Sequence, residues 1–207
     1  MGAHCCSHDH DSPPQPDPKY RRILWIALVV NALMFVVEII FSLRANSASL
    51  LADSIDFLGD AANYGISLWV LAQSVQTRAK ASLLKAASMA LFGIGVLAHA
   101  IWNAITGVIP DAQTMSLIGL LALGANLGVA WLLYAYRNGD SNMRSVWLCT
   151  RNDALGNIAV VLAAVGVFGT GTAWPDLIVA VIMATLALTA ATQIIKQARK
   201  ELKHHSS

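Results

Sequence analysis

The sequence predicts an all-α integral membrane protein with six transmembrane helices. Its 207 residues are 56% hydrophobic and only 13% charged, with a mean hydropathy of +0.56, whereas a soluble domain carries about 25% charged residues. Six apolar stretches are long enough to cross the ~30 Å of hydrocarbon in a bilayer. The basic residues between and beside these stretches lie almost entirely on one side of the bundle that the stretches would form. This composition excludes a soluble binding module.

The expected organisation is one membrane domain between two tails. Residues 1–20 are polar and contain His, Cys and Pro but no apolar core of a signal peptide, so we expect a disordered cytoplasmic tail. The membrane domain covers residues 21–197, and residues 198–207 form a short basic tail. The six expected helices lie at residues 22–43, 49–73, 83–106, 113–136, 143–169 and 174–195.

Each expected helix ends where polar or turn-forming residues interrupt the apolar run. A basic loop from Gln76 to Lys85 separates the second segment from the third, and a turn with Pro110 precedes the fourth. The polar loop RNGDSNMR precedes the fifth segment, and a Gly/Thr turn precedes the sixth. Such clusters of Gly, Pro and polar residues mark loops between helices.

The basic residues predict the orientation. An even number of helices places both termini on one side, and the excess of Lys and Arg marks the cytoplasmic side. Arg44 is the one basic residue on the opposite side, and Arg151 lies within the fifth segment. The tails and loops on the expected cytoplasmic side contain Lys19, Arg21, Arg22, Arg78, Lys80, Lys85, Arg137, Arg144, Lys196, Arg199, Lys200 and Lys203. We therefore expect a multi-pass protein of a bacterial-type inner (plasma) membrane, with cytoplasmic termini.

Acidic residues inside the apolar segments are the main functional signal. The second segment carries Asp53, Asp56 and Asp60, whose spacing places them on one helical face. An ionised carboxylate at bilayer depth costs roughly 2.5–3.5 kcal/mol, so a cation, protons or a basic partner must compensate for them. Arg151 is the only formal positive partner within the segments. The alternative is a structural network of protonated carboxyls with one ion pair. The full set of acids is Glu38, Asp53, Asp56, Asp60, Asp153 and Asp176.

Two pairs of potential metal ligands have the same helical spacing. Asp56 and Asp60 are four residues apart in the second segment, as are Cys149 and Asp153 in the fifth. Two helices that each present such a pair can supply four donors, which suits tetrahedral Zn²⁺ and would also accept Cd²⁺ or Co²⁺. A thiolate argues against Mg²⁺ and Ca²⁺. Four further residues are expected next to this site or along a pathway to it: Asp53, Asn31, Glu38 and Asn157.

The segments that carry these pairs, SASLLADSIDFLGDAANY and CTRNDALGNIAVVLAA, resemble the cation diffusion facilitator (cation efflux) family over about residues 22–196. The resemblance places Asp56, Asp60, Cys149 and Asp153 at the family's ligand positions and Asp53 one turn before them. It implies a six-helix bundle, a homodimer, and antiport of a divalent metal against protons. The metal would be a transported substrate rather than a cofactor, and the protein would not be an enzyme.

The sequence departs from the family pattern at two places. Cys149 replaces the usual His of the fifth segment, which removes the residue best suited to titrate near pH 7. Proton coupling would then depend on the aspartates or the thiol. The chain also stops about a dozen residues after Ile195, so we expect a member that consists of the transmembrane domain alone.

The N-terminal tail and two competing functions complete the predictions. His4, Cys5, Cys6, His8 and His10 form a cluster of metal-binding residue types, which either collects cytoplasmic metal or binds it incidentally. A proton-coupled small-molecule exporter would use the same acids only as proton relays. An intramembrane aspartyl hydrolase would need two carboxylates that share a proton. No nucleic-acid-binding motif is present in the sequence. The basic residues are explained by the membrane topology.

Overall fold

The computed structural model describes the backbone of residues 18–69, 75–136 and 141–204, and their side chains except at 75–78, 141–149, 151–152, 197, 200–201 and 203–204. The described residues form six helices and no strand. The helices are α1 (Pro18–Ala45), α2 (Ala48–Trp69), α3 (Val75–Thr106), α4 (Ala112–Tyr134), α5 (Ser141–Thr170) and α6 (Trp174–His204). The predicted all-helical fold is confirmed.

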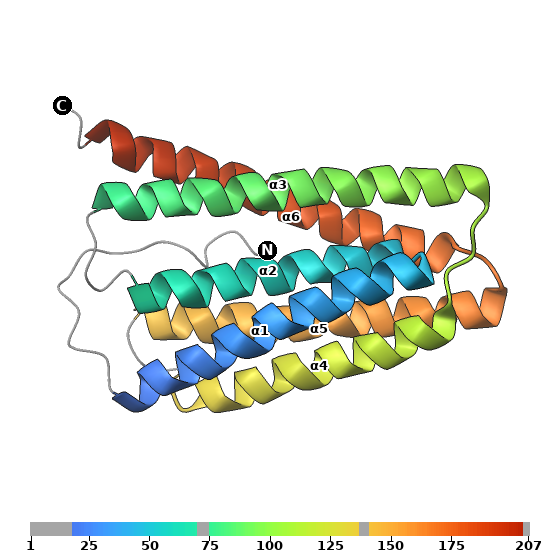
Figure 1. Cartoon of the computed structure of the whole chain (residues 1–207), viewed down its shortest axis with the longest axis horizontal. Helices are drawn as coiled ribbons and strands as arrows, with labels where there is room; N and C mark the ends of the chain where they lie inside the picture. Colours follow the sequence, from blue (N-terminus) through green and yellow to red (C-terminus); the bar gives the residue numbers. More distant parts are fainter. Residues whose placement is uncertain (1–17, 70–74, 137–140, 205–207) are drawn as a thin grey trace.

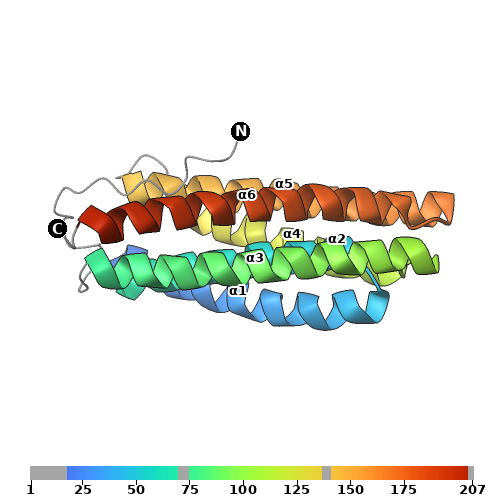
Figure 2. The ribbon, with the colours of Figure 1, turned by 90° about the horizontal axis from the view of Figure 1, so that it is seen from above.

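The six helices run along one long axis, and consecutive helices are antiparallel (Figure 1). Helix α1 therefore begins, and α6 ends, at the same end of the bundle. The most extensive packing joins α3 to α6, α1 to α2 and α4 to α5. In the view of Figure 2, α5 and α6 lie on one side of the bundle and α1 on the other. Helix α2 contacts all five other helices, so the helix with three aspartates occupies the centre.

Helix α1 is an inside-out helix, as expected for a bundle in lipid. It buries the polar side chains of Asn31 and Glu38 completely and exposes about half or more of Trp25, Leu33 and Leu43. In water this arrangement would lose the hydrophobic contribution that stabilises soluble folds. In a bilayer the apolar face contacts acyl chains, and the polar face is sheltered among helices.

Five of the six described helices are long and apolar enough to cross a membrane. The exception is α2, because Asp53, Asp56 and Asp60 all lie within it. Its 22 residues still give a length of about 33 Å at 1.5 Å per residue. Its central position keeps those carboxyls away from lipid, which reconciles its composition with the predicted six-helix bundle.

Helices α1, α3, α5 and α6 are longer than the sequence predicted, and α3 and α6 show the largest extensions. Helix α3 begins at Val75, so the stretch from Gln76 to Lys85 is helical rather than a loop. Helix α6 continues to His204, through most of the expected basic tail. Neither extension contains Gly or Pro, and both are rich in Ala, Lys, Arg and Gln, which favour helix. In both helices, the point where the sequence changes from apolar to basic therefore does not coincide with the end of the helix, which continues into the basic residues.

A hydrogen-bonded corner joins α1 to α2. Asn46 has a positive φ of 52°, and Ser47 accepts a hydrogen bond from the backbone N–H of Leu50 at 3.2 Å, as an N-cap does. The backbone carbonyl of Asn46 accepts from the side-chain amide of Asn103 at 2.7 Å. The N–H of Asp111 donates to the carbonyl of Ala45 at 2.9 Å. The corner is therefore fixed to α3 and to the segment that precedes α4.

Asp176, in the first turn of α6, completes this corner. Its buried carboxylate accepts hydrogen bonds from the hydroxyl groups of Ser47 (2.7 Å) and Ser49 (2.6 Å). It also accepts from the backbone N–H groups of Ala48 (2.8 Å) and Ser49 (3.0 Å). Those N–H groups belong to the positive end of the α2 dipole, where a carboxylate is stabilising. Asp176 is thus a structural anchor between α6 and α2.

Candidate metal site

The aspartates of α2 lie on its inward face, as their spacing predicted. Asp53 and Asp60 are buried, and Asp56 is half-buried. Because α2 is central, this face can meet acidic residues of both α1 and α5. The structure brings an acidic residue of α1 to Asp53, at the beginning of this face, and an acidic residue of α5 to Asp60, at its end.

The first pair joins α2 to α5. The carboxyl groups of Asp60 and Asp153 lie within hydrogen-bonding reach of each other, and Asp56 is close enough to interact electrostatically with both. The Oδ2 atom of Asp153 has no protein hydrogen-bond partner among the described residues. Two of the four predicted ligands, Asp60 and Asp153, therefore meet where α2 contacts α5.

Two hydroxyl groups form hydrogen bonds at this contact between α2 and α5 and were not predicted from the sequence. The Tyr64 hydroxyl donates to Asp60 Oδ2 at 3.4 Å and shares a 2.6 Å hydrogen bond with the Thr150 hydroxyl. Tyr64 lies one helical turn after Asp60, and Thr150 follows Cys149 directly. Their positions in the sequence, next to two predicted ligands, could have identified them as residues that contact the site.

The fourth predicted ligand, Cys149, has a side chain outside the described residues, as does Arg151. Among the described side chains, no three His, Cys, Asp or Glu residues come close enough together to hold a metal ion. The four-ligand set thus stays a prediction. The N-terminal cluster of His4, Cys5, Cys6, His8 and His10 also lies outside the described residues.

The second acidic pair joins α1 to α2. Glu38 and Asp53 are fully or almost fully buried, and their carboxyl groups lie next to each other. None of their four carboxyl oxygens has a hydrogen-bond donor among the described residues. Two ionised carboxylates have no proton to share, so this pair requires a proton or a cation between them.

Buried amides accompany the acids. Asn31 donates to the carbonyl of Ala27 at 2.8 Å, but its Oδ1 has no partner in the described part of the chain. Neither side-chain polar atom of Asn157 has one either, and Asn126 on α4, which the sequence analysis did not consider, has an unpartnered Oδ1. A buried polar atom without a partner costs about 1–3 kcal/mol. Asn31 and Asn157 are thus buried in the bundle interior, and their role beside the site stays a prediction.

A basic side chain also reaches α2, contrary to the expectation that Arg151 is the only positive partner. Lys85 on α3 donates a short hydrogen bond from Nζ to Oδ1 of Asn63 and is close enough to attract the carboxylate of Asp60. The sequence did not indicate this contact, because Lys85 lies at the end of the basic stretch from Gln76 to Lys85, which was expected to be a loop.

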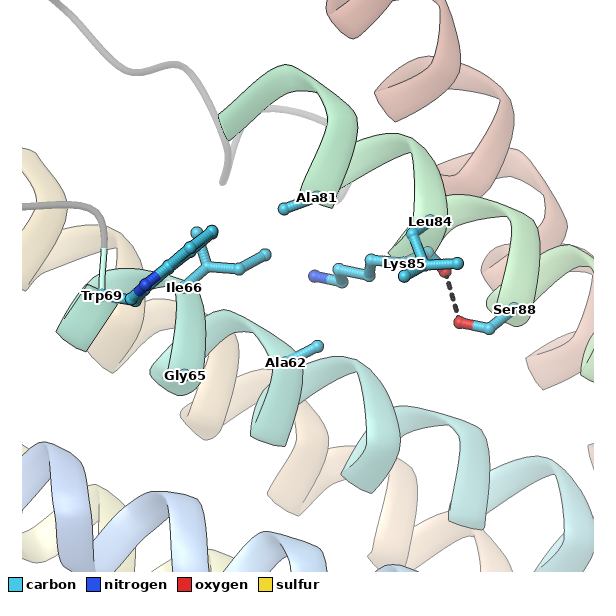
Figure 3. A pocket seen from close by; sticks show the side chains of 8 residues that line it. All are labelled: Ala62, Gly65, Ile66, Trp69, Ala81, Leu84, Lys85 and Ser88. Atoms are coloured by element: carbon cyan, nitrogen blue, oxygen red, sulfur yellow. Dashed lines mark hydrogen bonds between the residues drawn. The ribbon is translucent and has the colours of Figure 1, made fainter. Parts of the chain in front are cut away.

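A cavity of about 430 Å³ lies between α2 and α3 beside Lys85 (Figure 3). Its polar lining consists of Lys85 and Ser88, whose hydroxyl donates to the carbonyl of Lys85 at 2.7 Å. No carboxylate lines it, so it is not itself a cation site. The remaining lining residues are Ala62, Gly65, Ile66, Trp69, Ala81 and Leu84.

Comparisons with known proteins identify the family of the chain. Residues 24–203 match the family model described as the cation efflux transmembrane domain. The chain is 26% identical to the cadmium, cobalt and zinc/H(+)-K(+) antiporter of Bacillus subtilis over 85% of its own length and 61% of that protein. It is 26% identical to the zinc transporter ZitB of Escherichia coli, over 95% of this chain and 67% of the relative.

A third relative is the metal cation efflux system protein CzcD of Cupriavidus metallidurans, 26% identical over 88% of this chain and 60% of that protein. The chain thus spans about three fifths to two thirds of the length of these relatives. The family match covers most of the chain, and the members of this family are transporters, not enzymes. The chain belongs to the cation efflux family of multi-pass membrane proteins.

Proposed function

We propose that this protein exports a divalent metal cation from the cytoplasm in exchange for protons. The observation that carries the proposal is the meeting of Asp60 and Asp153 at the contact between the central helix α2 and α5. Acids buried at membrane depth mark ion or proton pathways. The names of the relatives, which include zinc, cadmium and cobalt, support a metal as the ion.

The proposed ligands are Asp56, Asp60, Cys149 and Asp153. Three carboxylate oxygens and one thiolate suit a tetrahedral cation of intermediate softness. Zn²⁺ is the leading substrate, followed by Cd²⁺ and Co²⁺. The Tyr64–Thr150 hydrogen bond supports the set, because it fixes α2 against α5 beside Cys149.

Protons are the proposed counter-ions. Metal ligands must be deprotonated to bind, and closely spaced carboxyls cannot all be ionised in a site of low dielectric. An incoming metal would therefore displace protons. The Glu38–Asp53 pair, together with the buried Asn31 and Asn157, is the proposed proton pathway.

The proposed orientation follows the basic residues. Most of them cluster at the end of the bundle where α1 begins and α6 ends, and the cytoplasmic side of a membrane carries such an excess. Bacterial relatives support an inner (plasma) membrane. We further propose a homodimer, and a tail whose His and Cys residues capture cytoplasmic metal.

The decisive experiment is metal uptake into proteoliposomes under an imposed pH gradient. The parent chain is compared with Asp153→Ala and Cys149→His across Zn²⁺, Cd²⁺, Co²⁺ and Mn²⁺, with the exposed Asp111→Asn as a matched acidic control. We expect gradient-driven flux that Asp153→Ala abolishes, Cys149→His redirects among metals, and Asp111→Asn leaves unchanged. Flux indifferent to Asp153 would instead favour a proton-coupled exporter of small molecules.

A further inference from the structure

Lys85 is a basic residue that packs directly against the acidic face of α2. Its stem lies over Gly59, where a Cβ on that glycine would be 4.0 Å from the lysine Cε. Its ammonium group donates a hydrogen bond to Asn63, one turn after Asp60. Figure 3 shows the side chain extending from α3 toward α2. The absence of a side chain at position 59 leaves room for this approach.

The charge of Lys85 lies close to a predicted metal ligand. Its ammonium group is held on Asn63, one helical turn after Asp60, and is near enough to attract the Asp60 carboxylate. A divalent cation near Asp60 would be repelled by the same ammonium, so Lys85 and the metal would compete for one carboxylate.

We propose that the Lys85 ammonium is a built-in counter-ion of Asp60, which an incoming divalent cation must displace. This inference rests on the proposed function, because it requires Asp60 to bind the exported cation. Lys85 lowers the affinity of the site for metal. It also speeds release, because the ammonium returns to Asp60 as the metal leaves.

The structure offers a place for the displaced side chain. Lys85 lines the cavity between α2 and α3, together with Ser88. A lysine stem is flexible and its ammonium has freely rotating donors, so the group can leave Asp60 without movement of a helix. Lysine side chains commonly extend along apolar walls in this way.

Equilibrium binding of Zn²⁺ to the full chain in lipid nanodiscs, measured by competition with a chromogenic zinc chelator, tests the proposal. Lys85→Met removes the charge, and Lys85→Gln removes the charge but keeps a donor for Asn63. We expect both to bind Zn²⁺ about tenfold more tightly than the parent, equivalent to about 1.4 kcal/mol. Lys85→Arg should stay within about threefold of the parent. Lys80→Met, an exposed position on the same helix, should bind like the parent.

Parent-like or weaker binding by the neutral Lys85 variants would overturn the proposal and reduce Lys85 to a structural tie between α3 and α2. An Asp60→Asn background provides a second test, since Lys85→Met should no longer tighten binding there. Asp153→Ala separates the two levels of inference. If Asp153→Ala binds Zn²⁺ as the parent does, the proposed function fails. If Asp153→Ala loses binding but Lys85→Gln does not tighten it, only the role of Lys85 fails.

Discussion

Two regions of the bundle treat buried carboxyl groups in opposite ways. At the α1–α2 corner, Asp176 accepts four hydrogen bonds. Between α1 and α2, about one turn further along α2, Glu38 and Asp53 are equally buried, but their carboxyl oxygens have no donor among the described residues. A carboxylate with four donors is satisfied as it stands, whereas one without donors needs a proton or a cation. The number of donors therefore separates a structural acid from a functional one.

The largest expected effect contrasts Asp60 with Asp176 in transport. Asp60→Asn removes a predicted ligand, so metal flux into proteoliposomes should fall at least about 100-fold, because loss of even a supporting partner costs about 10–100-fold. Asp176→Asn should keep metal binding in the protein that remains folded. Equal losses of zinc affinity in the two variants would erase the distinction between the regions.

The second prediction concerns the free energy of unfolding, for which we expect the corner acid Asp176 to matter more than Asp53. Asp176→Ala leaves two backbone N–H groups and two hydroxyl groups without their acceptor. The free energy of unfolding should fall by about 3 kcal/mol. Asp53→Asn should change it by less than about 1 kcal/mol, since no donor in the described structure is lost. Unfolding of the purified proteins in detergent, followed by circular dichroism, measures both.

The third prediction tests the acid pair between α1 and α2. Glu38→Gln keeps the shape of the side chain but cannot release a proton. We expect pH-driven zinc flux to fall about tenfold, as for partners near a metal site, while zinc affinity stays within about threefold. Stopped-flow measurements of flux and equilibrium binding on the same preparation separate these quantities. If Glu38→Gln lowered the zinc affinity as much as the flux, Glu38 would instead be assigned to the metal site and not to the proton pathway.

The smallest effect is expected at an exposed acid. Asp111 caps α4 by accepting from the N–H groups of Gln113 and Thr114, both at 3.3 Å, and from the Thr114 hydroxyl. The Thr114 hydroxyl is the main reason that the pKa of Asp111 is lowered. Asp111→Ala should cost about 1 kcal/mol.

Because the pKa of Asp111 is lower in the folded protein, its stabilising effect is present above the unfolded pKa. It is lost as the pH falls through the folded value. Unfolding of parent and Asp111→Ala, compared between neutral and acidic pH, should therefore converge at low pH. A difference that persists in acid would show that the cap acts without its charge.

The sequence predicted the fold well because hydrophobic length and the distribution of charge act along the chain. The i, i+4 spacing drew attention to Asp60 and Asp153, whose carboxyl groups lie close together in the structure, but the four-ligand set stays a prediction. The sequence could not distinguish Asp176 from Asp53, because hydrogen-bond donors come from residues more than 100 positions away, such as Ser47 and Ser49. It also missed Lys85, since a basic residue at a membrane boundary resembles a loop residue until the helix that carries it is known.

The most direct test of the central claim is the number of protons released when Zn²⁺ binds, measured by calorimetry in buffers of different protonation enthalpy. Acids that lack donors must hold protons before the metal arrives. The parent should therefore release protons, in a number that falls as the pH rises, and Asp153→Ala should release fewer. Zinc binding without proton release at any pH would contradict the exchange of metal for protons.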